Sequence, residues 1–305
     1  MKKFLLLQCF LLLLVANATA QNFNRRYQTT LRGDMIVVGN TVLGTHRTNN
    51  FDDRNTVNGE VRQVWVDIDD DRSTFNSSSA NVKDPNPGSS CARTVKKAYL
   101  YWAASSWGWP NNLDKSKFNE VKFKVDNGNY HSIVGQEILN DSNAYIYVAD
   151  VTDKLTGVAG TYTVADIEAP EGVSTGYAGG WTLFIVYEDL TKPARNITLF
   201  DGYAEIGGNT KDIHVSGFKT VATGPVKAKI AFSALEGDAR YTGDQLILVT
   251  NKTGPSGSTL QPKGRSTYNF FNSTITNENG ENLDRNPASR NLLGYDAGIF
   301  DVPNN

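Results

Sequence analysis

Short runs of apolar and β-branched residues recur along the chain, and clusters of Gly, Asn, Asp and Pro separate them. Very few segments repeat apolar residues with the 3.6-residue period of a helix. This pattern is typical of the strands of an all-β protein. It predicts strands over residues 34–38, 60–66, 97–102, 120–125, 144–148, 160–164, 181–187, 196–200, 228–232 and 245–249.

Two of these segments show how the strands are arranged. Residues 120–125 alternate charged and apolar side chains, so Val121, Phe123 and Val125 are expected to face a core. Residues 181–187 are apolar at nearly every position, which predicts a strand covered on both faces. A sheet that holds both kinds of strand needs stacked layers. We therefore predict an all-β fold, a β-sandwich that is jelly-roll-like or built of two stacked antiparallel sheets.

The segments between the strands carry weaker signals. Residues 150–155 are the best candidate for a short helix, because Asp and Thr side chains there can cap its first turn. Residues 74–90 and 251–266 are rich in Ser, Asn, Pro and Gly and are expected to be long exposed loops. The two glycines at 179–180 predict a turn before the strand that follows them.

The N-terminus has the features of a secretory signal peptide. Lys2 and Lys3 precede an apolar run over residues 4–15, which is too short to span a bilayer. Small residues follow up to Ala20, so residues 1–20 are predicted to be cleaved after Ala20. The rest of the chain has no apolar stretch of membrane-spanning length. We therefore expect a secreted or cell-surface protein whose mature chain has no transmembrane helix.

Residues 21–305 are expected to form one β-sandwich domain, since all-β domains of this size are common. No internal repeat and no firm linker divides the segment. Two sandwiches that meet near residue 220 are the alternative organisation.

The composition excludes several classes of protein. The chain has 305 residues, with 30 Lys and Arg against 32 Asp and Glu, and the formal net charge of −2 argues against a nucleic-acid-binding protein. Only two cysteines are present, and one of them, Cys9, lies in the predicted signal peptide, which excludes a disulfide scaffold. The chain also lacks the Gly-x-Ser-x-Gly, His-Glu-x-x-His and phosphate-loop motifs. We assign no catalytic residue.

An acidic segment follows the predicted strand that ends at residue 66. Asp67, Asp69 and Asp71 alternate, which is the spacing at which a loop presents carboxylate oxygens to Ca²⁺. The segment is not an EF-hand, because Arg72 stands where that loop needs Gly and Ser78 where it needs Glu. A calcium site at these three aspartates and a solvated acidic turn are both consistent with the pattern.

Glu236-Gly237-Asp238 and Gly243-Asp244 form a second oxygen-rich region. Gly-Asp steps suit tight turns, and cation ligation is the alternative role. Any suitably spaced pair of carboxylates could serve a glycosidase, but the sequence selects no pair.

Aromatic residues gather between residues 99 and 109. Trp107 and Trp109 fall after a predicted strand, in a segment with Gly and Pro, and loop tryptophans are candidates for contact with a ligand such as a glycan. Packing over the end of the sandwich is the alternative role of these two rings.

Several blocks of the chain together resemble a known domain. The blocks are residues 66–69 (VDID), 74–78 (TFNSS), 98–102 (AYLYW), 162–167 (YTVADI), 179–181 (GGW), 186–188 (VYE), 195–202 (RNITLFDG), 285–287 (RNP) and 293–296 (LGYD). They resemble the N-terminal β-domain of very large secreted surface proteins of Bacteroidota, which include the adhesins of gliding flavobacteria exported by the type IX system. The resemblance covers about residues 33–302. This chain has Asp70 where those domains usually have Gly.

The resemblance implies a non-catalytic, cell-surface or secreted adhesin module that contacts glycan, a surface or a partner protein through its loops. It also implies export and surface attachment by dedicated machinery, with gliding motility or cell adhesion as the role. Because such adhesins are much longer, we expect this chain to be a fragment. The alternatives are an extracellular carbohydrate-active enzyme or glycan-binding module, and a structural stalk or cap domain.

Overall fold

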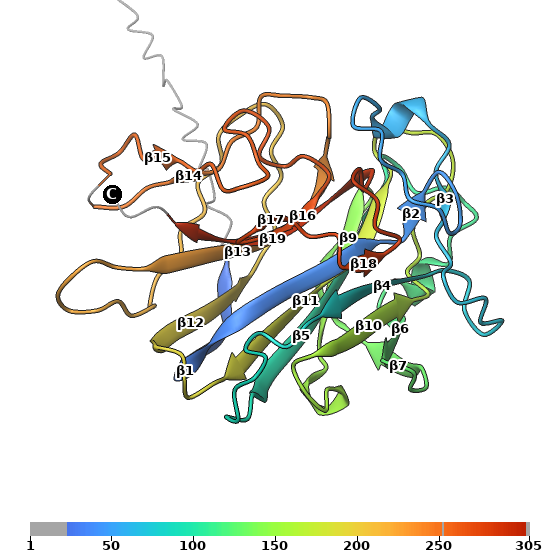
Figure 1. The fold of residues 1–305 in the computed structure, drawn as a ribbon. Coiled ribbons are helices and arrows are strands. Elements are labelled where there is room, and N and C mark those ends of the chain that lie inside the picture. The colour runs from blue at the N-terminus through green and yellow to red at the C-terminus, as the bar shows by residue number, and fades with distance from the viewer. Residues whose placement is uncertain (1–22, 252, 303–305) are drawn as a thin grey trace, which may run out of the picture.

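The computed structural model describes residues 23–251 and 253–302. The predicted signal peptide therefore lies outside the described residues. The fold is all-β and sandwich-like, with several mainly antiparallel sheets (Figure 1). Only three single turns of 3-10 helix occur in the described part of the chain, η1 (Asn58–Glu60), η2 (Lys115–Lys117) and η3 (Thr152–Lys154). None of the described helices is long and apolar enough to cross a membrane.

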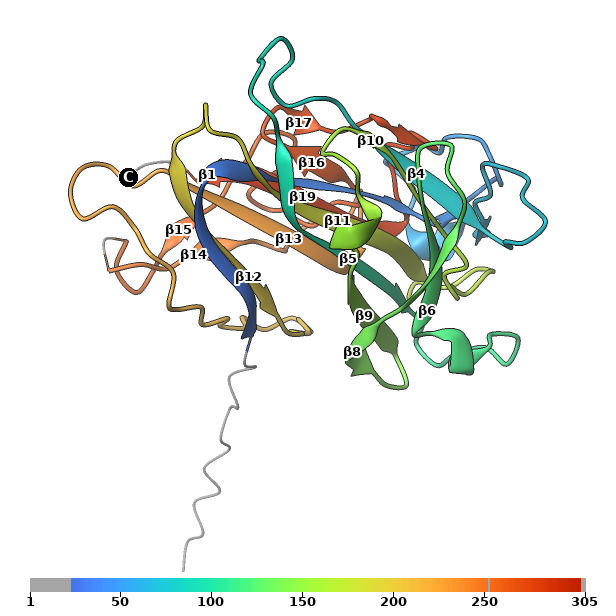
Figure 2. The ribbon, with the colours of Figure 1, turned by 90° about the horizontal axis from the view of Figure 1, so that it is seen from below.

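The largest sheet has six strands and forms the central layer. Its order is β12 (Ala194–Asp201), β1 (Asn24–Thr41), β11 (Ala178–Glu188), β5 (Thr94–Ser105), β9 (Ala144–Asp150) and β8 (Gln136–Asn140). β1 is long enough to pair with β12 through its first half and with β11 through its second half. The β8–β9 pair is seen beside β5 in Figure 2.

A five-stranded sheet packs against one face of this layer. Its order is β18 (Arg285–Asn286), β4 (Ser77–Val82), β10 (Gly160–Ala165), β6 (Glu120–Val125) and β7 (His131–Val134). A four-stranded sheet contains β13 (Ala228–Gly237), β19 (Gly294–Val302), β16 (Ile275–Asn277) and β17 (Gly280–Glu281). Two small pairs complete the fold, β2 (Leu43–Gly44) with β3 (Val64–Trp65) and β14 (Ile247–Leu248) with β15 (Ser258–Thr259).

β11 shows why the molecule needs three layers. Leu183 and Ile185 point into a core shared with the five-stranded sheet, whereas Phe184 and Val186 point into a second core with β12 and β19. Successive side chains of a strand point to opposite faces, so an uninterrupted apolar run fills both cores. The prediction that this strand is covered on both faces is confirmed.

The charged and apolar alternation over residues 120–125 is also confirmed, because β6 has these bounds. Val121 and Phe123 are buried, and Val125 packs at the margin of the same core.

The C-terminal part of the chain joins the central sheets rather than standing apart. β18 pairs with β4, and the Asn40 side chain on β1 donates to the carbonyl oxygens of Ser79 (3.0 Å) and Asn286 (2.9 Å). The hydroxyl of Tyr295 on β19 lies 2.9 Å from the Thr182 hydroxyl on β11. Residues on both sides of position 220 therefore share one sheet and a buried polar network.

A buried ion pair organises the four-stranded sheet. The Arg265 and Asp296 side chains have no exposed surface, and their charged atoms lie 2.8 Å apart. Arg265 also donates to the carbonyl oxygens of Phe270, Thr274 and Ala297. Its guanidinium group lies 5.4 Å from the ring centre of Phe270. One side chain thus fixes several loops around β19.

Four of the predictions for local structure are wrong. The first is the exposed loop over residues 74–90, because residues 77–82 form the buried strand β4. Its serines pack closely and bind neighbours: Ser78 accepts a hydrogen bond from the Trp181 indole (2.9 Å). A run of serines has little strand propensity by itself, so tertiary pairing with β10 decides the conformation.

The second is the strand over residues 60–66, since only Val64–Trp65 is a strand and Asn58–Glu60 is a 3-10 turn. The backbone of Gln63 instead exchanges hydrogen bonds with a loop residue, Gly172. The third is the strand over 245–249, which is reduced to Ile247–Leu248 because only one side of this run packs on a core.

The fourth is the turn at residues 179–180, because both glycines lie inside β11. A Cβ atom on Gly180 would lie 2.5 Å from the Asn40 carbonyl oxygen and 2.8 Å from the Tyr295 ring, so close packing requires glycine there. The short helix over 150–155 is the single turn η3.

Candidate functional site

The acidic segment is held by cationic side chains. The Asp67 carboxylate lies 2.6 Å from the Arg47 guanidinium, and the Ser77 hydroxyl lies 3.0 Å from a carboxylate oxygen of both Asp67 and Asp69, between which its one proton is shared. Asp69 also binds the Lys124 ammonium (2.8 Å). Two of the three predicted calcium ligands therefore meet at Ser77, and each also has a cationic partner.

Hydrogen bonds determine the charge state of this segment. Burial raises the pKa of Asp69, but hydrogen bonds from Lys124, Tyr130 and Ser77 outweigh burial and hold the pKa below its ordinary value. The Asp71 carboxylate accepts from the backbone N–H of Ser73, which lowers its pKa. Within the described ranges, no group of three or more His, Cys, Asp or Glu side chains is arranged to hold a metal ion. The calcium site and the acidic turn both stay predictions for this segment.

Chelation separates the two interpretations of the acidic segment. Because Arg47 and Lys124 already neutralise Asp67 and Asp69, we expect the same melting temperature in EDTA as in excess CaCl₂. We expect Asp69→Asn to cost about 2 kcal/mol of unfolding free energy in either solution, since it leaves the partly buried donors of Lys124 and Tyr130 without a charged partner. Calorimetry measures both effects, and a melting temperature that falls in EDTA would show that calcium binds.

Trp109, one of the two predicted contact residues, braces its loop. Its ring packs against Phe118 (4.9 Å between ring centres) and Tyr145 (5.7 Å). Its indole N–H donates to the Asp141 carbonyl oxygen at the end of β8 (2.8 Å). Packing over the end of the sandwich is the use the structure shows for this ring.

Trp107, the other predicted contact residue, is 70% exposed. Its ring lies over Gly176, where an added Cβ atom would be 2.7 Å from it. The loop is fixed on either side of this residue, because the Ser106 N–H donates to the Asn143 carbonyl and the Ser106 hydroxyl to the Gly108 carbonyl. The loop therefore holds a large apolar ring in solvent.

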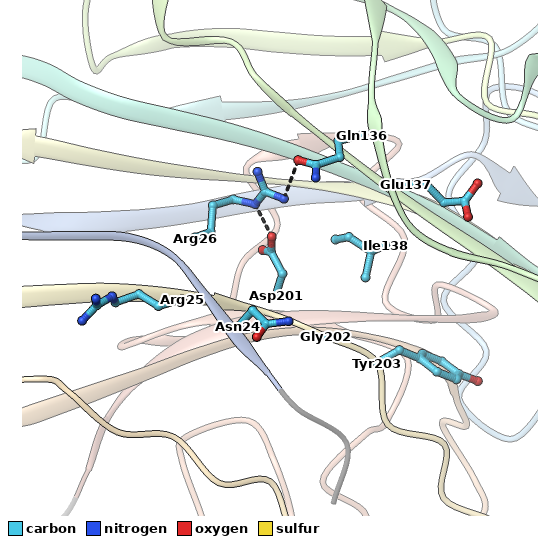
Figure 3. Close-up of a pocket in the computed structure, with 9 residues that line it drawn as sticks. All are labelled: Asn24, Arg25, Arg26, Gln136, Glu137, Ile138, Asp201, Gly202 and Tyr203. Atoms are coloured by element: carbon cyan, nitrogen blue, oxygen red, sulfur yellow. Dashed lines mark hydrogen bonds and ion pairs between the residues drawn. The ribbon is translucent and has the colours of Figure 1, made fainter. Parts of the chain in front are cut away.

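A polar groove is lined in part by the start of β8, and the sequence did not reveal it (Figure 3). Its volume is about 530 Å³. Three segments supply its walls: the start of β1, the start of β8 and the end of β12 with the two residues after it. The lining residues are Asn24, Arg25, Arg26, Gln136, Glu137, Ile138, Asp201, Gly202 and Tyr203.

The charges at the centre of the groove neutralise one another. Arg26 forms an ion pair with Asp201 and donates to the Gln136 side-chain oxygen (3.1 Å), as Figure 3 shows. The other carboxylate oxygen of Asp201 accepts from the Tyr101 hydroxyl (2.6 Å), which comes up from the second core. The groove floor is therefore fixed by a chain of hydrogen bonds that is anchored in a packed core.

Two carboxyl groups with raised pKa values lie near the same end of the molecule. Glu236 sits at a bulge of β13 with a φ of 64°, and its side chain accepts from the Ser105 hydroxyl at the end of β5. Burial, with a smaller effect of the Asp238 charge, raises the pKa of Glu236 to about 7. Burial likewise raises the pKa of Asp238 to about 6. Both groups change charge close to neutral pH.

Tyr203 is a groove residue on which the charge of Glu236 acts. It lines the groove, and burial together with the charges of Glu205, Asp141 and Glu236 raises its pKa to about 12. It is therefore a neutral hydroxyl at any physiological pH. The Trp107 loop, the groove and the Glu236 bulge all lie near the β8–β9 pair. The Trp107 loop bonds to Asn143, the start of β8 lines the groove, and Glu236 bonds to Ser105 beside the start of β9.

Comparison with known proteins adds nothing to this geometry: no protein-family model, no curated protein and no solved structure matches the chain.

Proposed function

We propose that the protein is a secreted or cell-surface adhesin module that binds glycan, a surface or a partner protein without catalysing a reaction. The observation that carries this proposal is the exposed ring of Trp107 on a braced loop. Large aromatic residues dominate the energy of many interfaces, and an apolar ring kept in water favours binding. The resemblance to adhesin domains of Bacteroidota supports the same role.

The bracing explains how such a loop could bind well. Trp109 fixes one side of the loop through Phe118 and Asp141, and Ser106 fixes the other. A loop that is already ordered loses little conformational entropy on binding, so more of the contact energy contributes to affinity. Export through the type IX system, attachment to the cell surface and a part in gliding belong to this proposal.

The second candidate is a carbohydrate-active enzyme, and the Glu236 and Asp238 pair favours it. A carboxylic acid with a pKa near 7 can donate a proton at neutral pH, as a general acid of a glycosidase does. This alternative predicts release of reducing sugar that Glu236→Gln abolishes. A stalk or cap domain would instead bind no ligand at all.

We expect Trp107→Ala to weaken binding to the recognised surface or polysaccharide about tenfold, which corresponds to about 1.4 kcal/mol. The melting temperature should stay within 1–2 °C, on the order of what a mild surface change produces, because most of the ring is already in solvent. Pull-down on insoluble polysaccharides and on intact cells measures the binding.

Tyr268→Ala is the matched control, since Tyr268 is an exposed ring (65%) on another loop. Equal binding by the Trp107→Ala variant and the unchanged protein would contradict the role given to this loop.

A further inference from the structure

The polar groove is a second candidate contact region, separate from the Trp107 loop. We propose that it binds a segment of a neutral polysaccharide, with Tyr203 as the surface on which a sugar ring packs. This inference rests on the proposed function, for which it names a ligand class and a site.

The size and rigidity of the groove suit such a ligand. Its volume of about 530 Å³ is within the range of roughly 300–1,000 Å³ that is common for ligand sites. Most of its walls come from the ends of strands of the central sheet, with Gly202 and Tyr203 directly after β12, and Tyr101 ties the floor to the second core. A site built on strands keeps its geometry when the ligand leaves.

The charge of the groove argues for a neutral ligand. Arg26 and Asp201 neutralise each other. Arg26 also donates to the Gln136 side-chain oxygen, and Asp201 also accepts from the Tyr101 hydroxyl. The two other charged lining residues, Arg25 and Glu137, also carry opposite charges, and in Figure 3 Arg25 extends away from the Arg26–Asp201 pair. An acidic polymer would have to compete with Asp201 for Arg26, which would leave a carboxylate without its partner.

The remaining polar atoms suit hydroxyl groups. The Gln136 oxygen accepts from Arg26, which leaves its NH₂ group as a donor. The Asn24 amide offers both a donor and an acceptor. Within the described residues, neither the Gln136 NH₂ group nor the Asn24 side chain has a protein hydrogen-bond partner. A sugar hydroxyl both donates and accepts, so it can satisfy either amide.

Apolar surface completes the site. Ile138 reaches the groove from the margin of the second core, and the Tyr203 ring lines it beyond Gly202. The C–H faces of a pyranose pack on such surfaces while its hydroxyls bind the polar atoms. The groove is lined by the start of β8, whereas the Trp107 loop is bonded to Asn143 after the end of β8, so a long polysaccharide has two places to touch the protein.

Affinity electrophoresis of the full protein in gels that contain a soluble β-glucan, xylan, mannan or alginate tests the proposal. We expect retardation by at least one of the three neutral polymers. Tyr203→Ala should weaken that retardation tenfold or more, Asn24→Ala should weaken it severalfold, and Tyr203→Phe should leave it within threefold. Tyr268→Ala is the control for loss of a ring elsewhere.

The outcomes separate this inference from the proposed function. If a neutral polymer retards the protein and neither Tyr203→Ala nor Asn24→Ala changes the retardation, the groove is not the site, although the adhesive function stands. Retardation by alginate alone, or displacement of the neutral polymer by a pool of random peptides, overturns the assigned ligand class. If no polymer retards the protein, the groove proposal fails. The adhesive function is then decided separately, by whether binding to cells or surfaces depends on Trp107.

Discussion

Arg265→Met is expected to lower the free energy of unfolding by about 4 kcal/mol. The change removes the partner of a fully buried carboxylate, Asp296, and leaves the carbonyl oxygens of Phe270, Thr274 and Ala297 without their donor. Removing one member of a buried ion pair is far more damaging than removing an exposed one, because the remaining charge stays away from water. Urea unfolding at pH 7 measures the loss.

The matched control is Lys83→Met. Lys83 pairs with Asp284 at the surface, where the two side chains are 79% and 48% exposed, so its loss should cost no more than about 1 kcal/mol. Arg265→Lys should recover only part of the stability, since an ammonium cannot reproduce the planar set of donors. Equal losses for Arg265→Met and Lys83→Met would contradict the central role of Arg265 in the four-stranded sheet.

Glu236→Gln is expected to make the protein more stable at pH 8 and to leave its stability nearly unchanged at pH 4.5. The Glu236 carboxyl is partly buried at a bulge, it accepts from a neutral hydroxyl, and the charge of Asp238 acts on it. A glutamine oxygen can accept the same hydrogen bond from Ser105 without carrying a charge.

The sign of this stability change follows from the raised pKa of Glu236. Well below pH 4.5 Glu236 is protonated in both the folded and the unfolded chain, and its effect on stability is small up to about pH 4.5. Between that pH and about 7 the folded chain keeps a proton that the unfolded chain has lost, so stability falls as the pH rises. The full loss is about 3 kcal/mol for a shift from 4.5 to about 7.

The other charged groups near this site do not reverse the sign. Asp238 acts in the same direction, because burial raises its pKa to about 6, and Glu60 adds to that effect. Arg240 is the cation that opposes it.

Urea unfolding of the unchanged protein and of the variant at pH 5, 6, 7 and 8 tests the prediction. Asp153→Asn, at an exposed carboxylate, is the control. Parallel pH profiles for Glu236→Gln and the unchanged protein would show that Glu236 titrates as an ordinary surface group.

The strands were predictable where apolar side chains alone decide the structure. The bounds of β6 and the two covered faces of β11 follow from periodicity, because alternate or continuous burial has a direct sequence pattern. β4 was not predictable in this way, since its serines become buried only when their hydroxyls meet Trp181 and Asp67. The place of Gly180 inside a strand was not predictable either. Its sequence suggests a turn, and only the Tyr295 ring packed beside it explains why glycine is needed in the strand.

The candidate site was predictable only in part. The sequence singled out Trp107 and Trp109 together, and the structure gives them different environments because only Trp109 meets Phe118 and the Asp141 carbonyl. The oxygen-rich segment at Glu236 was visible, but its raised pKa depends on burial against β5. The groove had no sequence signal, because residues near positions 25, 137 and 202 are brought together by the fold alone.

The most direct test of the adhesive, non-catalytic account measures binding and cleavage in one sample. The protein is incubated for several days with the neutral polysaccharide that retards it most, and the bound fraction and the polymer length are then determined by size-exclusion chromatography. The account predicts that polymer of unchanged length stays bound and that Trp107→Ala and Tyr203→Ala both reduce the bound fraction. Shortening of the polymer that disappears in Glu236→Gln would contradict it and would establish the enzyme instead.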